Sequence, residues 1–152
     1  MTELRIIRIS SQAEMEQALT IRRRVFIEEQ GVDEAIEIDE HDADPATVTS
    51  CAHVLGLLDG VPVATGRLLL GEGPEHEAHI GRVAVLASHR GKGHGRALME
   101  GLHALGRDLG YTEVALAAQV HALAFYEGLG YEAHGDVFMD AGIPHREMHR
   151  RL

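Results

Sequence analysis

Cysteine, tryptophan and proline are scarce in this 152-residue chain, which has one Cys, no Trp and four Pro. Cys51 has no second cysteine to pair with, which favours a cytoplasmic location. Long apolar runs are also missing. The most apolar stretch, near His53–Leu70, is interrupted by Asp59 and Arg67, whereas a membrane span needs about 18 or more apolar residues. The start of the chain lacks the apolar block of a signal peptide. We therefore expect no membrane partner.

Basic residues are outnumbered, with 14 Lys plus Arg against 24 Asp plus Glu, which argues against nucleic-acid binding. The charge is unevenly distributed. Glu28–Asp44 contains nine acids and no Lys or Arg, whereas Ala78–Met99 contains four Lys or Arg residues and no acid. These runs are either solvated faces or two sites, one for a cation and one for an anion. The length and the apolar content of 45% predict a single domain spanning residues 1–152.

The hydrophobic pattern mixes the periods of strands and helices. Strands are expected at Leu4–Ile9, Ala52–Leu58, Pro62–Leu70, Ile80–Ala87, Glu113–Ala118, Tyr131–Gly135 and His145–Leu152. Helices are expected from the Ser11/Glu14 capping box to Gly31, over Arg96–Leu109 and over His121–Leu129. The acidic stretch Asp33–Asp44 has no clean period and is predicted to be a loop, and Asp59-Gly60 predicts a hairpin turn. The fold class is therefore α/β (α+β), a mixed sheet with helices on both faces.

The segment Arg82–Arg96 has the sequence RVAVLASHRGKGHGR, in which a buried strand leads into three alternating glycines and then a helix. Glycines let backbone N–H groups approach an anion closely, and a helix start adds free N–H donors and positive charge. Three basic side chains add formal charge: Arg90, Lys92 and Arg96. The segment fits neither the dinucleotide pattern G-x-G-x-x-G nor the P-loop pattern. These features favour a diphosphate site.

The pattern that fits is R-x-x-G-x-G, formed by Arg90, Gly93 and Gly95. It resembles the acyl-CoA-binding motif of the GCN5-related N-acetyltransferase (GNAT) family. Downstream, Gln119, Ala122 and Tyr126 have the spacing of that family's Asn-x-x-Ala-x-x-x-Tyr segment, with Gln in place of Asn, and Gly130-Tyr131 closes it. The N-terminal RRRVFIEEQGV followed by acids further resembles a bacterial subgroup, the ElaA/YjcF-like acetyltransferases.

The resemblance implies a mixed, mostly antiparallel sheet of six to seven strands with one splayed strand pair, and acetyl-CoA as the acyl donor. The pantetheine arm would pair with the splayed strand, and the diphosphate would lie on the loop. Small residues (Ala115, Ala117 and Ala118) would keep the cleft open. The implied acetyl-CoA-binding residues are Val83, Ala84, Val85, Arg90, Gly91, Lys92, Gly93, His94, Gly95, Arg96, Gln119 and Tyr126.

The implied reaction is direct attack of an amine on the thioester. Tyr126 matches the family's general acid, because a phenol is protonated at neutral pH and can donate to the leaving thiolate. The Val85 amide would stabilise the oxyanion. For the general base we favour Glu29, with His79 second, since both carry groups able to accept a proton. The acidic segment Glu28–Asp44 is a candidate attractor for a cationic amine.

Other interpretations stay open. A non-catalytic acyl-CoA sensor or interaction module would keep the same fold, and another phosphate ligand such as a nucleotide would suit the same loop. His76-x-x-His79 and His145-x-x-x-His149 have metal-site spacings but no recognisable third ligand, so we expect no metal. Cys51 is expected to be a small buried residue. The acceptor amine is not identified, and a homodimer is left open because the family often dimerises.

Overall fold

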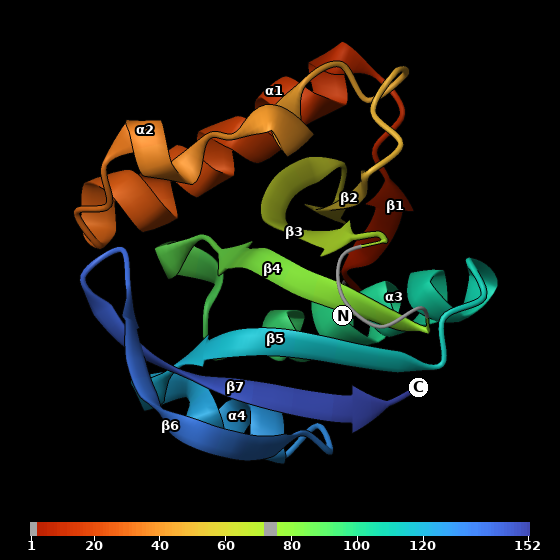
Figure 1. Ribbon diagram of the computed structural model, residues 1–152. Coiled ribbons are helices and arrows are strands. Elements are labelled where there is room, and N and C mark those ends of the chain that lie inside the picture. Colours follow the sequence, from red (N-terminus) through yellow and green to blue (C-terminus); the bar gives the residue numbers. More distant parts are fainter. Residues whose placement is uncertain (1–2, 72–75) are drawn as a thin grey trace.

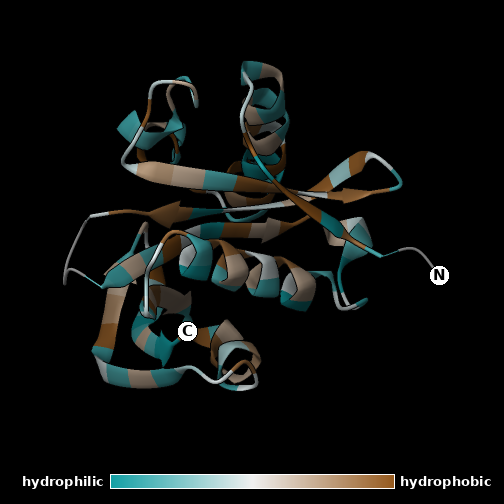
Figure 2. Cartoon of the chain, turned by 90° about the vertical axis from the view of Figure 1, so that its right-hand side faces the viewer, coloured by the Kyte–Doolittle hydropathy of each residue, from teal (hydrophilic) through white to brown (hydrophobic). Residues whose placement is uncertain are grey.

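The computed structural model describes residues 3–71 and 76–152 and contains one seven-stranded sheet with helices on both faces (Figures 1 and 2). The strands are β1 (Arg5–Arg8), β2 (Cys51–Leu58), β3 (Val61–Leu69), β4 (Glu77–Val85), β5 (Glu113–Gln119), β6 (Glu132–Asp140) and β7 (Ile143–Arg151). The α-helices are α1 (Gln12–Arg22), α2 (Glu34–Glu37), α3 (His94–Asp108) and α4 (Leu123–Glu127). One π-helical segment, η1 (Arg23–Glu29), continues α1, and three 3-10 turns are η2 (Glu40–Asp42), η3 (Ala87–His89) and η4 (Val120–Ala122).

The strand order is β1-β2-β3-β4-β5-β7-β6, and β4/β5 is the parallel pair in an otherwise antiparallel sheet. The predicted mixed, mostly antiparallel sheet is confirmed. So is the predicted hairpin, because Asp59 and Gly60 join β2 to β3 with φ angles of 52° and 79°. Two strands extend at least three residues beyond their predicted bounds: β4 begins at Glu77 rather than Ile80, and β6 continues to Asp140 rather than Gly135. Most of β6 is exposed, so no buried apolar pattern marks its full length.

The first helix begins as predicted. Glu14 N–H donates to Ser11 Oγ at 3.2 Å, and the Glu14 carboxylate accepts from Ser11 N–H at 3.2 Å. After Arg22 the backbone widens into η1, which ends just before Gly31, a residue with φ of 72°. A π-turn keeps the chain helical, so the apolar period predicted the helix but not this change.

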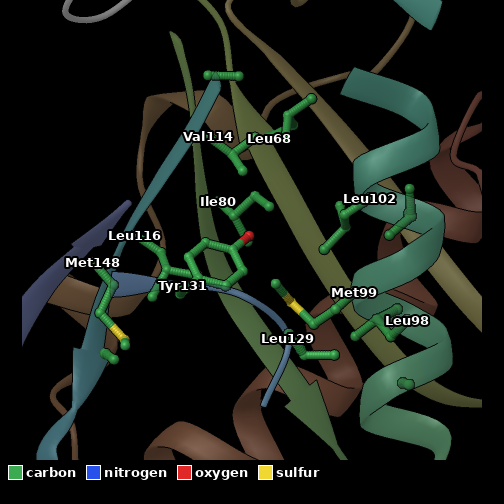
Figure 3. Packing of buried hydrophobic residues seen from close by; sticks show 14 of the residues in the cluster. Leu68, Ile80, Leu98, Met99, Leu102, Val114, Leu116, Leu129, Tyr131 and Met148 are labelled. Carbon is green, nitrogen blue, oxygen red and sulfur yellow. The ribbon is translucent and has the colours of Figure 1, made fainter. Parts of the chain in front are cut away.

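Two cores lie on opposite faces of the sheet. Figure 3 shows the larger core, in which Leu98 and Leu102 of α3 belong to the same cluster as Ile80 of β4 and Leu116 of β5. The helix predicted over Arg96–Leu109 is therefore present as α3, with Leu98 and Leu102 on its buried face. The smaller core lies between α1 and the sheet. Cys51 is buried, as expected, and burial raises the pKa of its thiol to about 12.

The acidic segment is not the loop that its sequence predicted. It forms α2 and η2, and two of its acids, Glu37 and Asp42, are buried against arginines of α1 and β3. Arg22 Nε lies 3.0 Å from Glu37 Oε1, and Arg22 Nη1 lies 2.6 Å from Asp42 Oδ1. Arg67 holds both carboxylate oxygens of Asp39 at 2.8 and 2.7 Å. These partners are remote in sequence, so no local period reveals the short helices.

The same ion-pair network decides the protonation of Asp39. Burial alone would raise the pKa of this carboxyl, but hydrogen bonds and charge from Arg67 outweigh it and hold the pKa well below its usual range. Arg82 of β4 joins the network, with its Nε 3.1 Å from Glu37 Oε2. The acids that were expected to attract a cation are therefore largely neutralised by arginines of the chain itself.

A polar chain also crosses the larger core. His103 of α3 is 2% exposed; its Nε2 lies 2.6 Å from the Tyr131 hydroxyl and its Nδ1 lies 2.8 Å from Arg150 Nη1. Because a guanidinium only donates, Nδ1 must accept, and the ring proton of the neutral imidazole lies on Nε2. Burial, together with the charges of Arg150 and Arg107, lowers the pKa of His103 to about 4.

We expect replacement of Arg22 by Met to lower the free energy of unfolding by about 3–5 kcal/mol, because it removes the one guanidinium that pairs with both buried carboxylates, Glu37 and Asp42. Each carboxylate then keeps a single arginine, Arg82 for Glu37 and Arg67 for Asp42. Arg23→Met is the matched control. Its ion pair with Glu34 is 43% and 61% exposed, so the cost should stay under about 1 kcal/mol. Urea unfolding of both variants measures the difference, and equal losses would contradict a special contribution from the buried pairs.

Stability should depend on pH through His103. The folded protein keeps this imidazole neutral down to about pH 4, whereas in the unfolded chain it takes up a proton near pH ~6.5. The contribution is therefore complete above pH ~6.5 and is lost as the pH falls toward 4. His103→Gln, which can still accept from Arg150 and donate to Tyr131, should flatten the stability profile in this range by about one proton. An unchanged slope in urea titrations at several pH values would refute the assignment.

Candidate functional site

The site begins where β4 and β5 separate. They pair only over Glu77–Ile80 and Glu113–Leu116, although β4 continues to Val85 and β5 to Gln119. Figure 1 shows the two ribbons diverging beyond this point. The splayed pair expected from the family resemblance is present, and it leaves backbone groups on the facing edges without a strand partner.

A bulge in β4 accompanies the separation. The register with β3 shifts between the pairs Arg67↔Gly81 and Thr65↔Ala84, and Arg82 has a φ of 53°. A bulge adds a residue to one strand and increases its local twist, which turns β4 away from β5. Beyond it, Leu86 N–H donates to Val63 O at 2.9 Å. Since antiparallel pairs alternate, the Val85 backbone groups point to the opposite edge, toward the splay.

The glycine loop closes the open end of the splay. Gly91 and Gly93 have φ angles of 75° and 83°, and Gly93 begins α3 without a side-chain cap. The N–H groups of the first turn of α3 therefore have no N-cap side chain to accept their hydrogen bonds. A Cβ at Gly95 would lie 3.3 Å from Phe125 Cζ, a tight contact that the Phe125 ring would have to relieve by moving. Lys92 and Arg96 are both exposed beside these amides.

Arg90 fastens the loop to two other elements. Its Nη1 and Nη2 donate to the two carboxylate oxygens of Glu29 at 2.8 and 2.9 Å, and its Nε donates to Val85 O at 2.9 Å. Glu29, our first candidate for the base, thus lies at the open end of the splay with both oxygens accepting from an arginine. This two-point contact suits Glu29 to hold the Arg90 side chain in place.

Gln119 makes a second link at the same end. Its Nε2 donates to Gln30 Oε1 at 2.9 Å, and its Oε1 lies 2.7 Å from His121 Nε2. Glu29 and Gln30 therefore contact the loop after β4 and the end of β5, so the end of η1 bridges the mouth of the splay. Sequence analysis missed Gln30, because nothing local marks a residue whose partner is 89 positions away.

His79 lies next to the last paired residue of β4, at the closed end of the splay. Its side chain is 35% exposed, and its Nε2 lies 4.0 Å from Glu147 Oε2 on β7. Beside them, His149 Nδ1 lies 3.1 Å from Glu77 Oε2, and the rings of His134 and His149 are 4.3 Å apart. No helix covers this part of the sheet face in Figure 1. Glu147 was missed; its alternation with His145 and His149 is the signal that it shares their face.

Tyr126 lies on α4 and packs edge-on against Phe125 and Tyr131, with ring centroids 5.0 and 5.8 Å away. Burial raises the pKa of its hydroxyl to about 12, so the group stays protonated at neutral pH. The structure gives this hydroxyl no hydrogen-bond partner within the described residues. The hydroxyl therefore carries a proton that no other described group accepts.

The remaining predicted residues divide by face. Val83 and Val85 are half-buried against the larger core, whereas Ala84 is buried toward α1. His94 is buried in the first turn of α3. Ala115 and Ala118 are buried in β5, and Ala117 is half-buried between them.

Two further findings concern the described residues 3–71 and 76–152. No three side chains of His, Cys, Asp or Glu among them converge as a metal site. None of the helices in those segments has the length and apolar character needed to cross a membrane.

Comparison with known proteins agrees with this geometry. The model of the acetyltransferase (GNAT) family matches residues 15–131. YyaT of Bacillus subtilis is 38% identical over 98% of this chain and 97% of its own, and the N-acetyltransferase YjcF of the same organism is 32% identical over 91% and 93%.

Solved structures superpose closely. Escherichia coli ElaA has a TM-score of 0.83 at 28% identity and covers 99% of both chains. An acyl-CoA N-acyltransferase from Pseudomonas aeruginosa has a TM-score of 0.81 at 31% identity and covers 97% of this chain and 99% of its own. An aminoglycoside 6′-N-acetyltransferase complexed with coenzyme A shares the fold, with a TM-score of 0.74 at 15% identity over 97% of this chain and 96% of its own. The chain therefore belongs to the GNAT family and is an enzyme of the N-acetyltransferase type, related to YjcF and ElaA as its motifs predicted.

Proposed function

We propose that this enzyme transfers an acetyl group from acetyl-CoA to a primary amine by direct attack. The observation that carries the proposal is the splay of β4 and β5, which opens onto the uncapped, glycine-lined start of α3. Free strand edges suit an amide-containing arm, and free helix amides suit a diphosphate. Coenzyme A contains both, joined end to end. It is also the molecule bound to the aminoglycoside acetyltransferase that shares this fold.

The two ends of acetyl-CoA, the diphosphate and the thioester, set its orientation in the splay. With the diphosphate on residues 90–95, where Lys92 and Arg96 add positive charge, the pantetheine arm runs along Val83–Val85 toward the closed end. From Val85 back to Ile80 the strand covers roughly 16 Å. The thioester then lies near the closed end, and the Val85 amide, which points into the splay, is a donor along the arm.

This orientation separates the two candidate bases. Glu29 lies at the diphosphate end and is engaged by Arg90, whereas His79 lies beside the closed end. We therefore assign His79 as the base, directly or through water, and Glu29 as the residue that positions Arg90. Glu147 Oε2, 4.0 Å from His79 Nε2, can stabilise the imidazolium that forms.

The proposed step transfers one acetyl group and two protons. The neutral amine nitrogen forms a bond to the thioester carbon, the carbon–sulfur bond breaks, and the proton released from nitrogen passes to His79. The leaving thiolate takes a proton from the Tyr126 hydroxyl, whose raised pKa keeps it protonated until it is needed. Ala117, which is half-buried in β5, contributes little side-chain volume between β4 and β7, which leaves room for the amine. A cytoplasmic location would supply the donor.

Charge reversal on the loop tests the donor site. Lys92→Glu should weaken acetyl-CoA binding at least about tenfold, because it replaces an attraction for the diphosphate by a repulsion. Arg24→Glu, at an exposed position of η1, is the control and should bind normally. Calorimetric titration measures both, with NAD and ATP as competitors. Selective binding of a competitor, or equal binding by both variants, would reject acetyl-CoA at this loop.

Two substitutions test the chemistry. Tyr126→Phe and His79→Ala should each lower kcat by about 10²–10⁴-fold while acetyl-CoA affinity stays unchanged, because each removes only a proton-transfer group. His76→Ala, at an exposed position just before β4, is the control. Thiol release from acetyl-CoA is measured with a panel of amines, polyamines, aminoglycosides and lysine peptides. Binding without transfer to any amine would favour an acyl-CoA sensor instead.

A further inference from the structure

A cavity of about 190 Å³ lies between α3, the turn after α4, and β7. It is lined by Arg96, Glu100, His103, Arg107, Gly128, Leu129 and Arg150. Three arginines thus face one small space beside a single acid. That acid, Glu100, is already engaged, since its Oε1 accepts from Arg96 Nε at 3.2 Å. The charges of Arg107 and Arg150 remain without a carboxylate partner among the described residues.

Arg150 is held in a defined position. Its Nη1 donates to Nδ1 of the buried His103 at 2.8 Å, and His103 is in turn fixed by the Tyr131 hydroxyl at 2.6 Å. Gly130 lies against the other side of the guanidinium, because a Cβ there would be 3.6 Å from Arg150 Nε. A neutral imidazole orients the guanidinium but does not neutralise it. The arrangement therefore presents an oriented, uncompensated positive charge to the cavity wall.

We propose that this cavity binds the phosphate group of a ligand other than the acyl donor, either inorganic phosphate or a phosphate monoester. Guanidinium groups recognise phosphate through paired N–H donors, and two of them converge here. At about 190 Å³ the space is smaller than the roughly 300–1,000 Å³ of pockets that hold drug-sized ligands, so it suits a small anionic group. An anion at this point would compensate the charges of Arg107 and Arg150 that the chain leaves unpaired.

The cavity runs along α3, from Arg96 in the first turn, beside the proposed diphosphate site, to Arg107 near the end of the helix. Arg107 follows Gly95 by 12 residues, which is about 18 Å along the helix axis. Arg96 lies at the near end of the cavity, so the 3′-phosphate of a bound coenzyme A is the alternative source of the same chemistry. The proposal itself does not depend on the acetyltransferase reaction.

The test is calorimetric titration with inorganic phosphate and with glycerol phosphate. Arg107→Gln should weaken binding of at least one of them about tenfold or more, because it removes a charge that faces the cavity. Arg107 is exposed and bridges no other element, so this variant should fold normally. Arg150→Gln should have the same effect. Arg151→Gln, at the exposed next position of β7, is the matched control and should bind like the unmodified protein.

Titration with acetyl-CoA and with its 3′-dephospho form distinguishes a separate phosphate ligand from the donor's own 3′-phosphate. We expect Arg107→Gln to bind both as tightly as the unmodified protein does. If the variant loses affinity for acetyl-CoA but not for the dephospho form, the phosphate is the donor's own and the separate site is overturned. Absence of phosphate binding to the unmodified protein, or equal binding by Arg107→Gln, would also overturn it. Failure of acetyl-CoA to bind anywhere would reject the proposed function but leave this test intact.

Discussion

The early end of β4/β5 pairing is the constraint on which the rest of the site depends. Four residue pairs hold the strands together, and the bulge at Arg82 then turns β4 away. Every backbone group beyond Ile80 and Leu116 on the facing edges loses its strand partner, and unpaired backbone groups inside a protein need some partner. The fold therefore creates a polar slot in the middle of a sheet, and the glycine loop places the free amides of α3 at its open end.

The elements that surround this slot are held by charge rather than by apolar packing alone. Arg82 itself reaches back to Glu37, so the bulge that opens the sheet also anchors α2. At the mouth, Glu29 and Gln30 of the first helical stretch contact Arg90 and Gln119. Buried Arg22 and Arg67 fix the segment between these contacts. The acidic run is thus a structural counterpart to arginines on α1, β3 and β4.

Two polar systems lie on opposite faces of the same half of the sheet. On the face without a helix, His79 and Glu147 stand beside the closed end of the splay. On the α3 face, Tyr131, His103 and Arg150 form a hydrogen-bonded chain that ends at a cavity. Both systems use alternate residues of β7, since Glu147 and Arg150 point to different faces. One strand therefore carries the group proposed to assist the base on one face and the arginine proposed to bind an anion on the other.

The sequence by itself determined the elements whose signals are local. The apolar stripe of α3, the Asp59-Gly60 turn, the Ser11/Glu14 cap and the glycine loop each depend on neighbours within a few residues, and together with the motif spacing they were enough to predict the GNAT fold. Only the tertiary structure decided which side chains pair with one another. It showed that Glu29 binds Arg90, that Gln119 binds Gln30, that Glu37 and Asp42 are buried, and that Glu147 stands beside His79. The physical reason is that ion pairs and hydrogen bonds between side chains depend on distance in space, and residues remote in sequence meet only once the sheet is assembled.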